Sequence, residues 1–150
     1  MRHVNVDEVE SAGPTNATRL TDALDAENLA VNYYDLAPGE RFSGGMHTHL
    51  DQEELFVVTE GEATFETPED DHVVSAGEAI RFAPGEYQTG VNDGDEPVRA
   101  YALGAPRDSE EVRVPQKCSN CGHGSMAFVN ADEGPRLECP DCGTRVEVPE

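Results

Sequence analysis

Short runs rich in β-branched, aromatic and aliphatic residues recur from position 29 to position 103, and each run ends at turn residues such as Gly, Pro or Asp. Runs of this length between turn residues predict β-strands rather than helices. Many short strands joined by tight turns predict an all-β sandwich or barrel. The expected strands are 29–36, 54–59, 62–67, 72–75, 78–82, 87–92 and 98–103.

The segments that flank these strands differ from them in composition. In the polar N-terminal segment, Gly13-Pro14 predicts a turn and residues 19–24 predict a short helix. After the last strand, Pro106 and Pro115 fall in a stretch that predicts a polar linker. We therefore expect four units: an N-terminal segment 1–28 that packs on the barrel, a barrel over 29–105, a linker over 106–117, and a separate module over 118–150. Within the module, strands are expected at 126–130, 136–138 and 144–148.

The charge of the chain narrows the range of partners. There are 31 acidic and 10 basic residues, a net charge of −21. Such a field repels nucleic-acid phosphates and anionic lipids, so we expect no nucleic-acid and no membrane partner. Lys117 is the only lysine among the basic residues. This composition resembles that of proteins from salt-accumulating halophilic archaea, where concentrated salt screens the repulsion among carboxylates.

The chain lacks the sequence signals of a membrane or secreted protein. No apolar run approaches the roughly 20 residues of a membrane span, and residues 1–8 lack the apolar core of a secretory signal. We therefore expect a soluble, cytoplasmic protein. In that reducing compartment, the two Cys-x-x-Cys pairs favour metal binding over disulfides.

A candidate metal site lies in the first half of the predicted barrel. His47 and His49 point to the same side if they lie on a strand, and a turn at 50–52 lets a following carboxylate reach the same space. Two imidazoles and one carboxylate form a facial triad that leaves open positions on a metal. Alternation does not separate Glu53 from Glu54 as the carboxylate, because both share a face with apolar residues.

The alternative is that the two histidines only form hydrogen bonds inside the barrel. Burying two imidazoles and a carboxylate without a cation or polar partners is costly, which favours a metal.

The same stretch resembles the first motif of the cupin superfamily, through His47, His49, Glu54 and the later Gly61. The choice of Glu54 over its neighbour comes from this resemblance. The glycine that opens the family's motif is replaced by Arg41.

A second cupin motif follows at the usual distance. Gly77, Gly85 and Asn92 occupy its positions, and Ala83 stands where proline is usual. The remaining ligand histidine of the family is Gln88 here. Its amide oxygen is a weaker and harder ligand than imidazole, so it either coordinates weakly or binds a metal-held water or the substrate.

The resemblance implies a cupin-type jelly-roll β-barrel over 29–105, with a divalent metal (Fe, Mn, Ni or Zn) in its lumen. Arg81 and Tyr101 could line the barrel and contact a small polar ligand, but a purely structural role is favoured for both.

The C-terminal module carries a second candidate metal site. Cys118, Cys121, Cys139 and Cys142 form the pattern Cys-x2-Cys-x17-Cys-x2-Cys, which is typical of structural zinc. A unit this small buries too little core to fold alone, so metal is the expected source of its stability. The pattern also resembles rubredoxin, which holds redox iron, but Phe128 is the module's only aromatic residue. We therefore expect a structural zinc ribbon.

Two functions fit this organisation. The first is a metal-dependent enzyme acting on a small polar molecule, for example a dioxygenase or an isomerase, in which the metal acts as a Lewis acid or activates oxygen. The alternative is a non-catalytic barrel that senses a ligand or a metal, with the ribbon docking a protein partner. The ribbon's cations, Arg136 and Arg145, are too few for nucleic acid. A homodimer is also expected.

Overall fold

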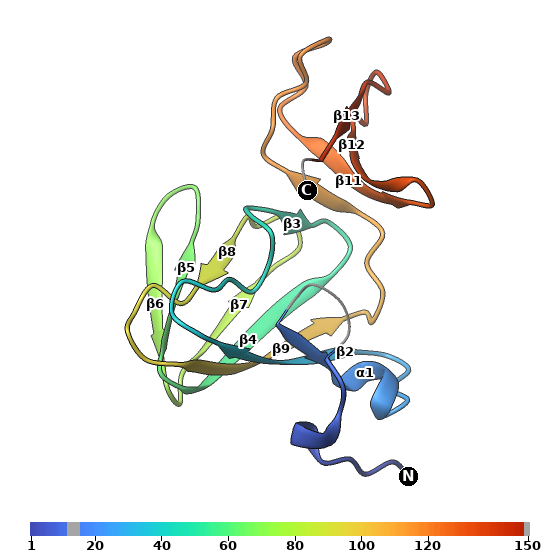
Figure 1. The fold of residues 1–150 in the computed structure, drawn as a ribbon. Helices are drawn as coiled ribbons and strands as arrows, with labels where there is room; N and C mark the ends of the chain where they lie inside the picture. Colours follow the sequence, from blue (N-terminus) through green and yellow to red (C-terminus); the bar gives the residue numbers. More distant parts are fainter. Residues whose placement is uncertain (12–15, 149–150) are drawn as a thin grey trace.

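The computed structural model describes residues 1–11 and 16–148, and the fold is all-β apart from two single helical turns. Two sheets face each other to form the barrel, with strand orders β1-β2-β9-β4-β7 and β6-β5-β8 (Figure 1). The helical turns are η1 (Val6–Glu8) and α1 (Leu20–Ala23). The barrel strands are β1 (Ala17–Arg19), β2 (Ala30–Leu36), β3 (Thr48–His49), β4 (Glu53–Glu60), β5 (Glu62–Glu66), β6 (Asp71–Ser75), β7 (Ala79–Phe82), β8 (Thr89–Val91) and β9 (Val98–Ala105).

The alternation of side chains along β9 determines which face is buried. Val98, Ala100 and Ala102 are buried, whereas Arg99 and Tyr101 point to the other face. β9 lies between β2 and β4 and pairs with both in antiparallel fashion. The small residues of this central strand leave room for larger side chains from the neighbouring strands.

Aromatic rings fill most of that room. Phe42, Phe56, Phe65 and Phe82 are all buried, and the rings of Phe56 and Phe65 have centroids 4.7 Å apart. Gly90 lies against this cluster, where a Cβ atom would approach the ring of Phe42 to 2.6 Å. The apolar core therefore occupies the middle of the barrel and leaves the polar histidines near one end.

The expected glycine turn at Gly61 has a clear physical reason. Its φ angle is +76°, in the left-handed region that favours glycine, and a Cβ atom there would collide with the carbonyl oxygen of Pro97. The turn joins β4 to β5 and so carries the chain from one sheet to the other.

The predicted barrel strands are all present, but three short strands were not predicted: β1, β3 and β10 (Val112–Val114). β10 corrects the expectation that 106–117 is a plain linker, because it pairs with β3 on one side and with β11 on the other. The C-terminal strands are β11 (Met126–Ala131), β12 (Gly134–Glu138) and β13 (Arg145–Glu147). A second five-stranded sheet, β13-β12-β11-β10-β3, therefore runs from the barrel into the module (Figure 1).

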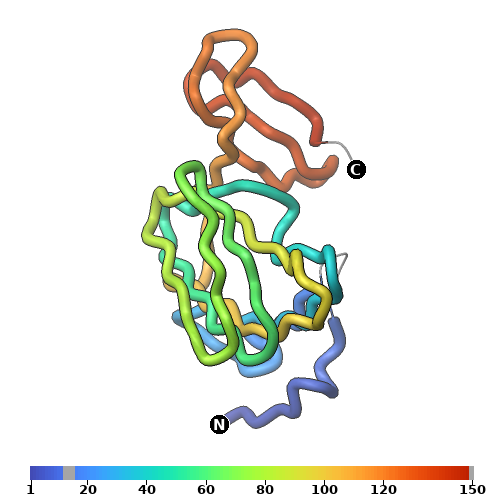
Figure 2. Tube along the Cα trace, turned by 90° about the vertical axis from the view of Figure 1, so that its left-hand side faces the viewer, coloured from blue at the N-terminus to red at the C-terminus, as the bar shows by residue number. Residues whose placement is uncertain are grey.

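The N-terminal segment and the cysteine-rich module lie at opposite ends of the barrel (Figure 2). The N-terminal segment is tied to the barrel by pairing of β1 with β2 and by buried Leu20. The predicted turn at Gly13-Pro14 lies outside the described residues. Within those residues, no helix has the length and apolar character needed to cross a membrane.

Candidate metal centres

Residues of the two cupin-like motifs meet through backbone hydrogen bonds. The N–H of His47 donates to the carbonyl of Gln88 at 3.1 Å, and the N–H of Gln88 donates back at 2.9 Å. The N–H of Gly85 donates to the carbonyl of His49 at 3.0 Å. These bonds place Gln88 beside the two histidines, although the motifs are far apart in the sequence.

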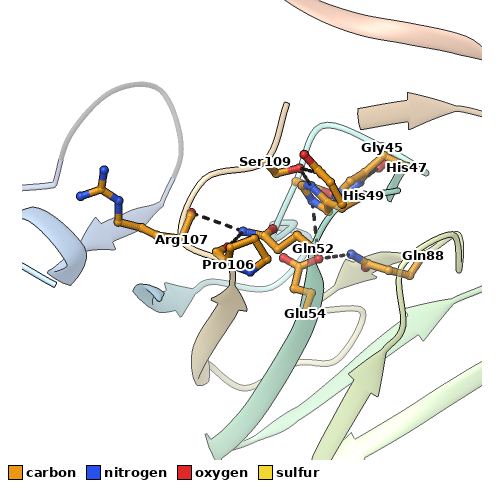
Figure 3. Close-up of polar contacts among 11 residues, drawn as sticks. Gly45, His47, His49, Gln52, Glu54, Gln88, Pro106, Arg107 and Ser109 are labelled. Carbon is orange, nitrogen blue, oxygen red and sulfur yellow. Dashed lines mark hydrogen bonds and ion pairs between the residues drawn. The ribbon is translucent and has the colours of Figure 1, made fainter. Parts of the chain in front are cut away.

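Both histidines use Nδ1 for a hydrogen bond within the protein (Figure 3). Nδ1 of His47 donates to the carbonyl oxygen of Gly45 at 2.8 Å, and Nδ1 of His49 lies 2.8 Å from the hydroxyl oxygen of Ser109. This arrangement leaves Nε2 of each ring as the nitrogen that faces a metal.

The structure separates the two adjacent glutamates. Glu54 points into the barrel beside its cross-strand neighbour Phe82, and its Oε2 lies 3.7 Å from Nε2 of His49. Glu53 points outward and forms an ion pair of 2.7 Å with Arg81. His47, His49 and Glu54 each offer one ligand atom, and these atoms all lie within 4.8 Å of one another.

Burial shifts the protonation of this cluster toward its uncharged forms. It lowers the pKa of His47, and it lowers the pKa of His49 to about 4, with a further contribution from neighbouring His47. Burial raises the pKa of Glu54 to about 7, against the opposing effect of the hydrogen bond from Gln88. The histidines are thus neutral near pH 7, as metal ligands must be. A buried carboxylate with a raised pKa is stabilised in its ionised form by a bound cation.

Gln88 occupies the position of the family's remaining histidine, and its surroundings fit a cation. Its Nε2 donates to Oε2 of Glu54 at 3.1 Å. Its Oε1 is buried and, among the described residues, has no hydrogen-bond partner. A buried acceptor of this kind is costly unless a donor or a cation satisfies it. The donor set of two imidazoles, a carboxylate and this amide oxygen therefore fits a divalent metal.

The alternative in which Arg81 and Tyr101 line the barrel is wrong. Arg81 lies opposite Leu55 in the β4–β7 pair, one position away from inward-facing Glu54, and so occupies the outer face. Tyr101 lies on the same outer face, where its ring centroid is 5.2 Å from that of Tyr33. Alternation along the strands places both residues away from the candidate metal site. The expected homodimer stays a prediction.

The four cysteines of the module converge on one point. The Sγ atoms of Cys118 and Cys142 are 3.7 Å apart, those of Cys121 and Cys139 are 3.6 Å apart, and all four lie within 4.8 Å of one another. Four sulfurs at about 2.3 Å from a tetrahedral zinc lie about 3.8 Å apart. The cluster therefore has the size of a four-cysteine zinc site.

Two similar backbone turns present these cysteines. In each Cys-x-x-Cys-Gly turn, the glycine N–H donates to the carbonyl of the first cysteine at 3.0 Å, from Gly122 to Cys118 and from Gly143 to Cys139. The hydroxyl of Thr144 lies 3.1 Å from Sγ of Cys142, and its hydrogen bond is the main cause that lowers the pKa of this thiol to about 5. A thiolate at neutral pH is the form that binds metal.

Comparison with known proteins agrees with this fold. The family model for the Cupin domain matches residues 32–104. No curated protein matches the chain. Among solved structures, the chain is similar to a sugar phosphate isomerase of the cupin superfamily from Silicibacter pomeroyi. The similarity covers 94% of this chain and 94% of that protein, with 22% identity and a TM-score of 0.69.

Two further structures are similar over less of the chain. The polyketide cyclase RemF from Streptomyces resistomycificus covers 80% of this chain over 89% of its own, with 21% identity and a TM-score of 0.63. A protein with a double-stranded β-helix domain from Klebsiella pneumoniae covers 72% of this chain over 87% of its own, with 22% identity and a TM-score of 0.59. At these identities the likeness shows the fold: the barrel, whose residues 32–104 are similar to the Cupin domain model, is a cupin-type jelly roll.

Proposed function

We propose that the barrel binds one divalent metal ion through His47, His49 and Glu54, and uses it to bind and transform a small polar molecule. The convergence of one ligand atom from each of His47, His49 and Glu54 within 4.8 Å, with both Nδ1 atoms already hydrogen-bonded, is the observation that carries this proposal. A bound divalent ion would supply Lewis acidity toward an oxygen of the ligand.

The charge of the donor set favours a particular class of ligand. One carboxylate among otherwise neutral donors leaves a divalent ion with a net charge of about +1. An anionic oxygen donor, such as a carboxylate or an enolate, neutralises this charge in a partly buried site. The side chains of His49 and Glu54 are 18% and 19% exposed, so part of the site is open to solvent.

Isomerisation of a hydroxy-carbonyl compound fits this chemistry. In such a reaction negative charge develops on two adjacent oxygens of the substrate, and a bound divalent ion with open positions would stabilise that charge. The similarity to a sugar phosphate isomerase over nearly the whole chain supports this choice among the reactions that cupin-type sites catalyse. Gln88, next to the carboxylate ligand, would orient the bound molecule through its amide.

Binding of manganese to the protein tests the proposal. We expect the wild type to bind about one equivalent of Mn²⁺ outside the cysteine cluster, and His49→Ala to lose it while the ribbon keeps its zinc. Adding small hydroxy acids or hydroxy-ketones to the manganese-loaded wild type should displace metal-bound water, seen as a fall in water proton relaxation. Equal manganese content in both proteins would overturn the assignment. His72→Ala serves as a control, because His72 is an exposed histidine on β6.

A second function is favoured by one specific observation. β3, which carries His49, belongs to the same sheet as the cysteine-rich strands. In a non-catalytic sensor, ligand or metal binding in the barrel would be passed through this sheet to the ribbon, where a protein partner would dock. Tight ligand binding without turnover by the manganese-loaded protein would favour this reading over the enzyme.

We also propose that the four cysteines hold a structural zinc ion. The sulfur spacings support this choice, and the module's own core is small, with Met126, Leu137 and two of the cysteines as its buried residues.

A further inference from the structure

The chain between β9 and β10 crosses the end of the barrel where the histidines lie (Figure 3). Gln52 holds the start of this crossing, because its Nε2 donates to the carbonyl oxygens of Pro106 at 2.8 Å and of Arg107 at 3.3 Å. Gln52 itself is 8% exposed and lies against Gly104, where a Cβ atom would come within 2.8 Å of its amide carbon. The crossing is therefore fastened to the residues that follow β3.

Asp51 holds three later residues of the crossing, 109–111. Its Oδ1 accepts a hydrogen bond of 2.6 Å from the hydroxyl of Ser109. Its Oδ2 accepts hydrogen bonds from the backbone N–H groups of Glu110 at 2.7 Å and Glu111 at 3.3 Å. The N–H of Leu50 donates to the carbonyl of Glu111 at 2.8 Å, just before β10 begins. Ser109 is thus held on both its side chain and its neighbouring backbone.

This fastening settles how Ser109 interacts with His49. A serine hydroxyl has one proton, and Ser109 gives it to Asp51. The remaining contact of 2.8 Å therefore has Nδ1–H of His49 as the donor and Oγ of Ser109 as the acceptor. With Nδ1 protonated, the lone pair of His49 is on Nε2, the atom that faces Glu54.

We propose that Ser109, held by Asp51, is a positioning residue that fixes the tautomer and ring orientation of His49 for the barrel metal. This inference rests on the proposed metal site and deepens it, because it adds a residue beyond the matched cupin segment 32–104. His47 needs no such residue, since a backbone carbonyl accepts its Nδ1–H. The barrel site is therefore completed by the segment that leads to the cysteine-rich module. Partners of this kind typically change metal affinity 10- to 100-fold when removed, on the order of the effect expected here.

The tautomer of His49 in metal-free protein tests the inference directly. Long-range ¹H–¹⁵N correlation spectra should show Nδ1–H as the dominant form of His49 in the wild type. Ser109→Ala should give a mixture of both forms at His49 and leave His47 unchanged, and Ser109→Thr should restore the wild-type pattern. Asp51→Ala should also give a mixture, because the freed hydroxyl of Ser109 can then donate to Nδ1. An unchanged tautomer of His49 in both Ser109→Ala and Asp51→Ala would overturn the inference.

Manganese titration of the same proteins gives the second readout. We expect Mn²⁺ affinity to fall about 10- to 100-fold in Ser109→Ala and to recover in Ser109→Thr. The matched control is Ser75→Ala, which should leave the affinity unchanged because the hydroxyl of Ser75 donates to exposed Glu62, away from the site. Unchanged affinity in Ser109→Ala together with a shifted tautomer would overturn the role in metal binding. Failure of the wild type to bind manganese would instead refute the metal site, while the tautomer readout would still test the contact between Ser109 and His49.

Discussion

His49 and Val112 lie directly opposite each other on the antiparallel strands β3 and β10. His49 is a candidate ligand of the barrel metal, whereas Val112 begins the strand that leads into the cysteine-rich module. Val114, at the other end of β10, faces Met126 on β11. Met126 is buried among the cysteines of the module. The two candidate metal centres are thus joined by consecutive strand pairs of one sheet.

This pairing predicts how far damage to the ribbon spreads. We expect Cys139→Ser to unfold most of residues 118–148, because metal is the main source of stability for so small a core. β10 should lose protection as well, since it loses its partner β11, while β2, β4 and β9 should keep theirs. Hydrogen exchange with the variant measures each strand separately.

Ser119→Ala, an exposed change within the same cysteine turn, is the control for this experiment. Full protection of β11 and β12 in Cys139→Ser would show that the module folds without its metal. Loss of protection throughout the barrel would show instead that barrel and ribbon unfold as one cooperative unit.

Gln88 should adjust the affinity of the barrel site without being essential to it. Gln88→His should bind Mn²⁺ more tightly, because imidazole is a better ligand than a neutral amide. Gln88→Ala should still bind measurably through the other three ligands. Isothermal titration of both variants checks this, with exposed Gln116→His as the matched control. Complete loss of binding in Gln88→Ala would make the amide an essential ligand.

Metal affinity should depend on pH through Glu54. Its pKa is raised to about 7 by burial, so below that pH a proton must leave before the carboxylate can bind a cation. The pKa of His49, lowered to about 4, keeps that ring neutral over the same range. We therefore expect Mn²⁺ affinity to rise about tenfold for each pH unit from 5 to 7 and then to level off. An affinity that is constant from pH 5 to pH 7 would contradict the assignment of Glu54 as a ligand.

The metal-free protein should show the opposite trend in stability. Raising the pKa of Glu54 from 4.5 to about 7 favours the folded state while the carboxyl is protonated, and this contribution is lost as pH rises through that interval. The loss amounts to about 3 kcal/mol at 1.36 kcal/mol per unit. The difference in unfolding free energy between wild type and Glu54→Gln, measured by urea titration at pH 4.5 and pH 7.5, isolates it from the other carboxylates. The same difference at both pH values would refute the raised pKa.

The protein should also be more stable in concentrated salt. A net charge of −21 on 150 residues creates self-repulsion that opposes the compact state, and ions screen it. We expect the midpoint of thermal unfolding, followed by circular dichroism, to rise between low and molar potassium chloride. An equal or lower midpoint in molar salt would count against the interpretation of the composition as halophilic.

Much of the barrel could be predicted from the sequence because its strands alternate and end at turn residues. The histidine pair and Gln88 were also predicted from spacing and resemblance. Glu54 could not be separated from Glu53 by pattern alone, since both neighbouring faces are apolar; only the pairing with β7 shows that Glu54 faces inward. The outer position of Arg81 follows from alternation, because Ile80 and Phe82 share the opposite, apolar face of β7. Tyr101 likewise shares its face of β9 with Arg99.

The missed elements are those without a long pattern. β3 has two residues and β10 has three, too few for a period to emerge. Val112-Arg113-Val114 does alternate, and this signal was available within the supposed linker. Ser109 gave no signal at all, because its role depends on contacts with Asp51 and His49 across the folded chain.

The position of β10 also limits where recombination could join the barrel to another protein without damaging it. A recombination event that joined the barrel to another protein right after β9 would strip the partner strand from β3 and leave an open strand edge prone to aggregation. It would also discard the hydroxyl that accepts the Nδ1–H of His49. A crossover beyond Val114 keeps both. The smallest unit that preserves the barrel site therefore extends past residue 104, where the match to the Cupin domain model ends, to the end of β10.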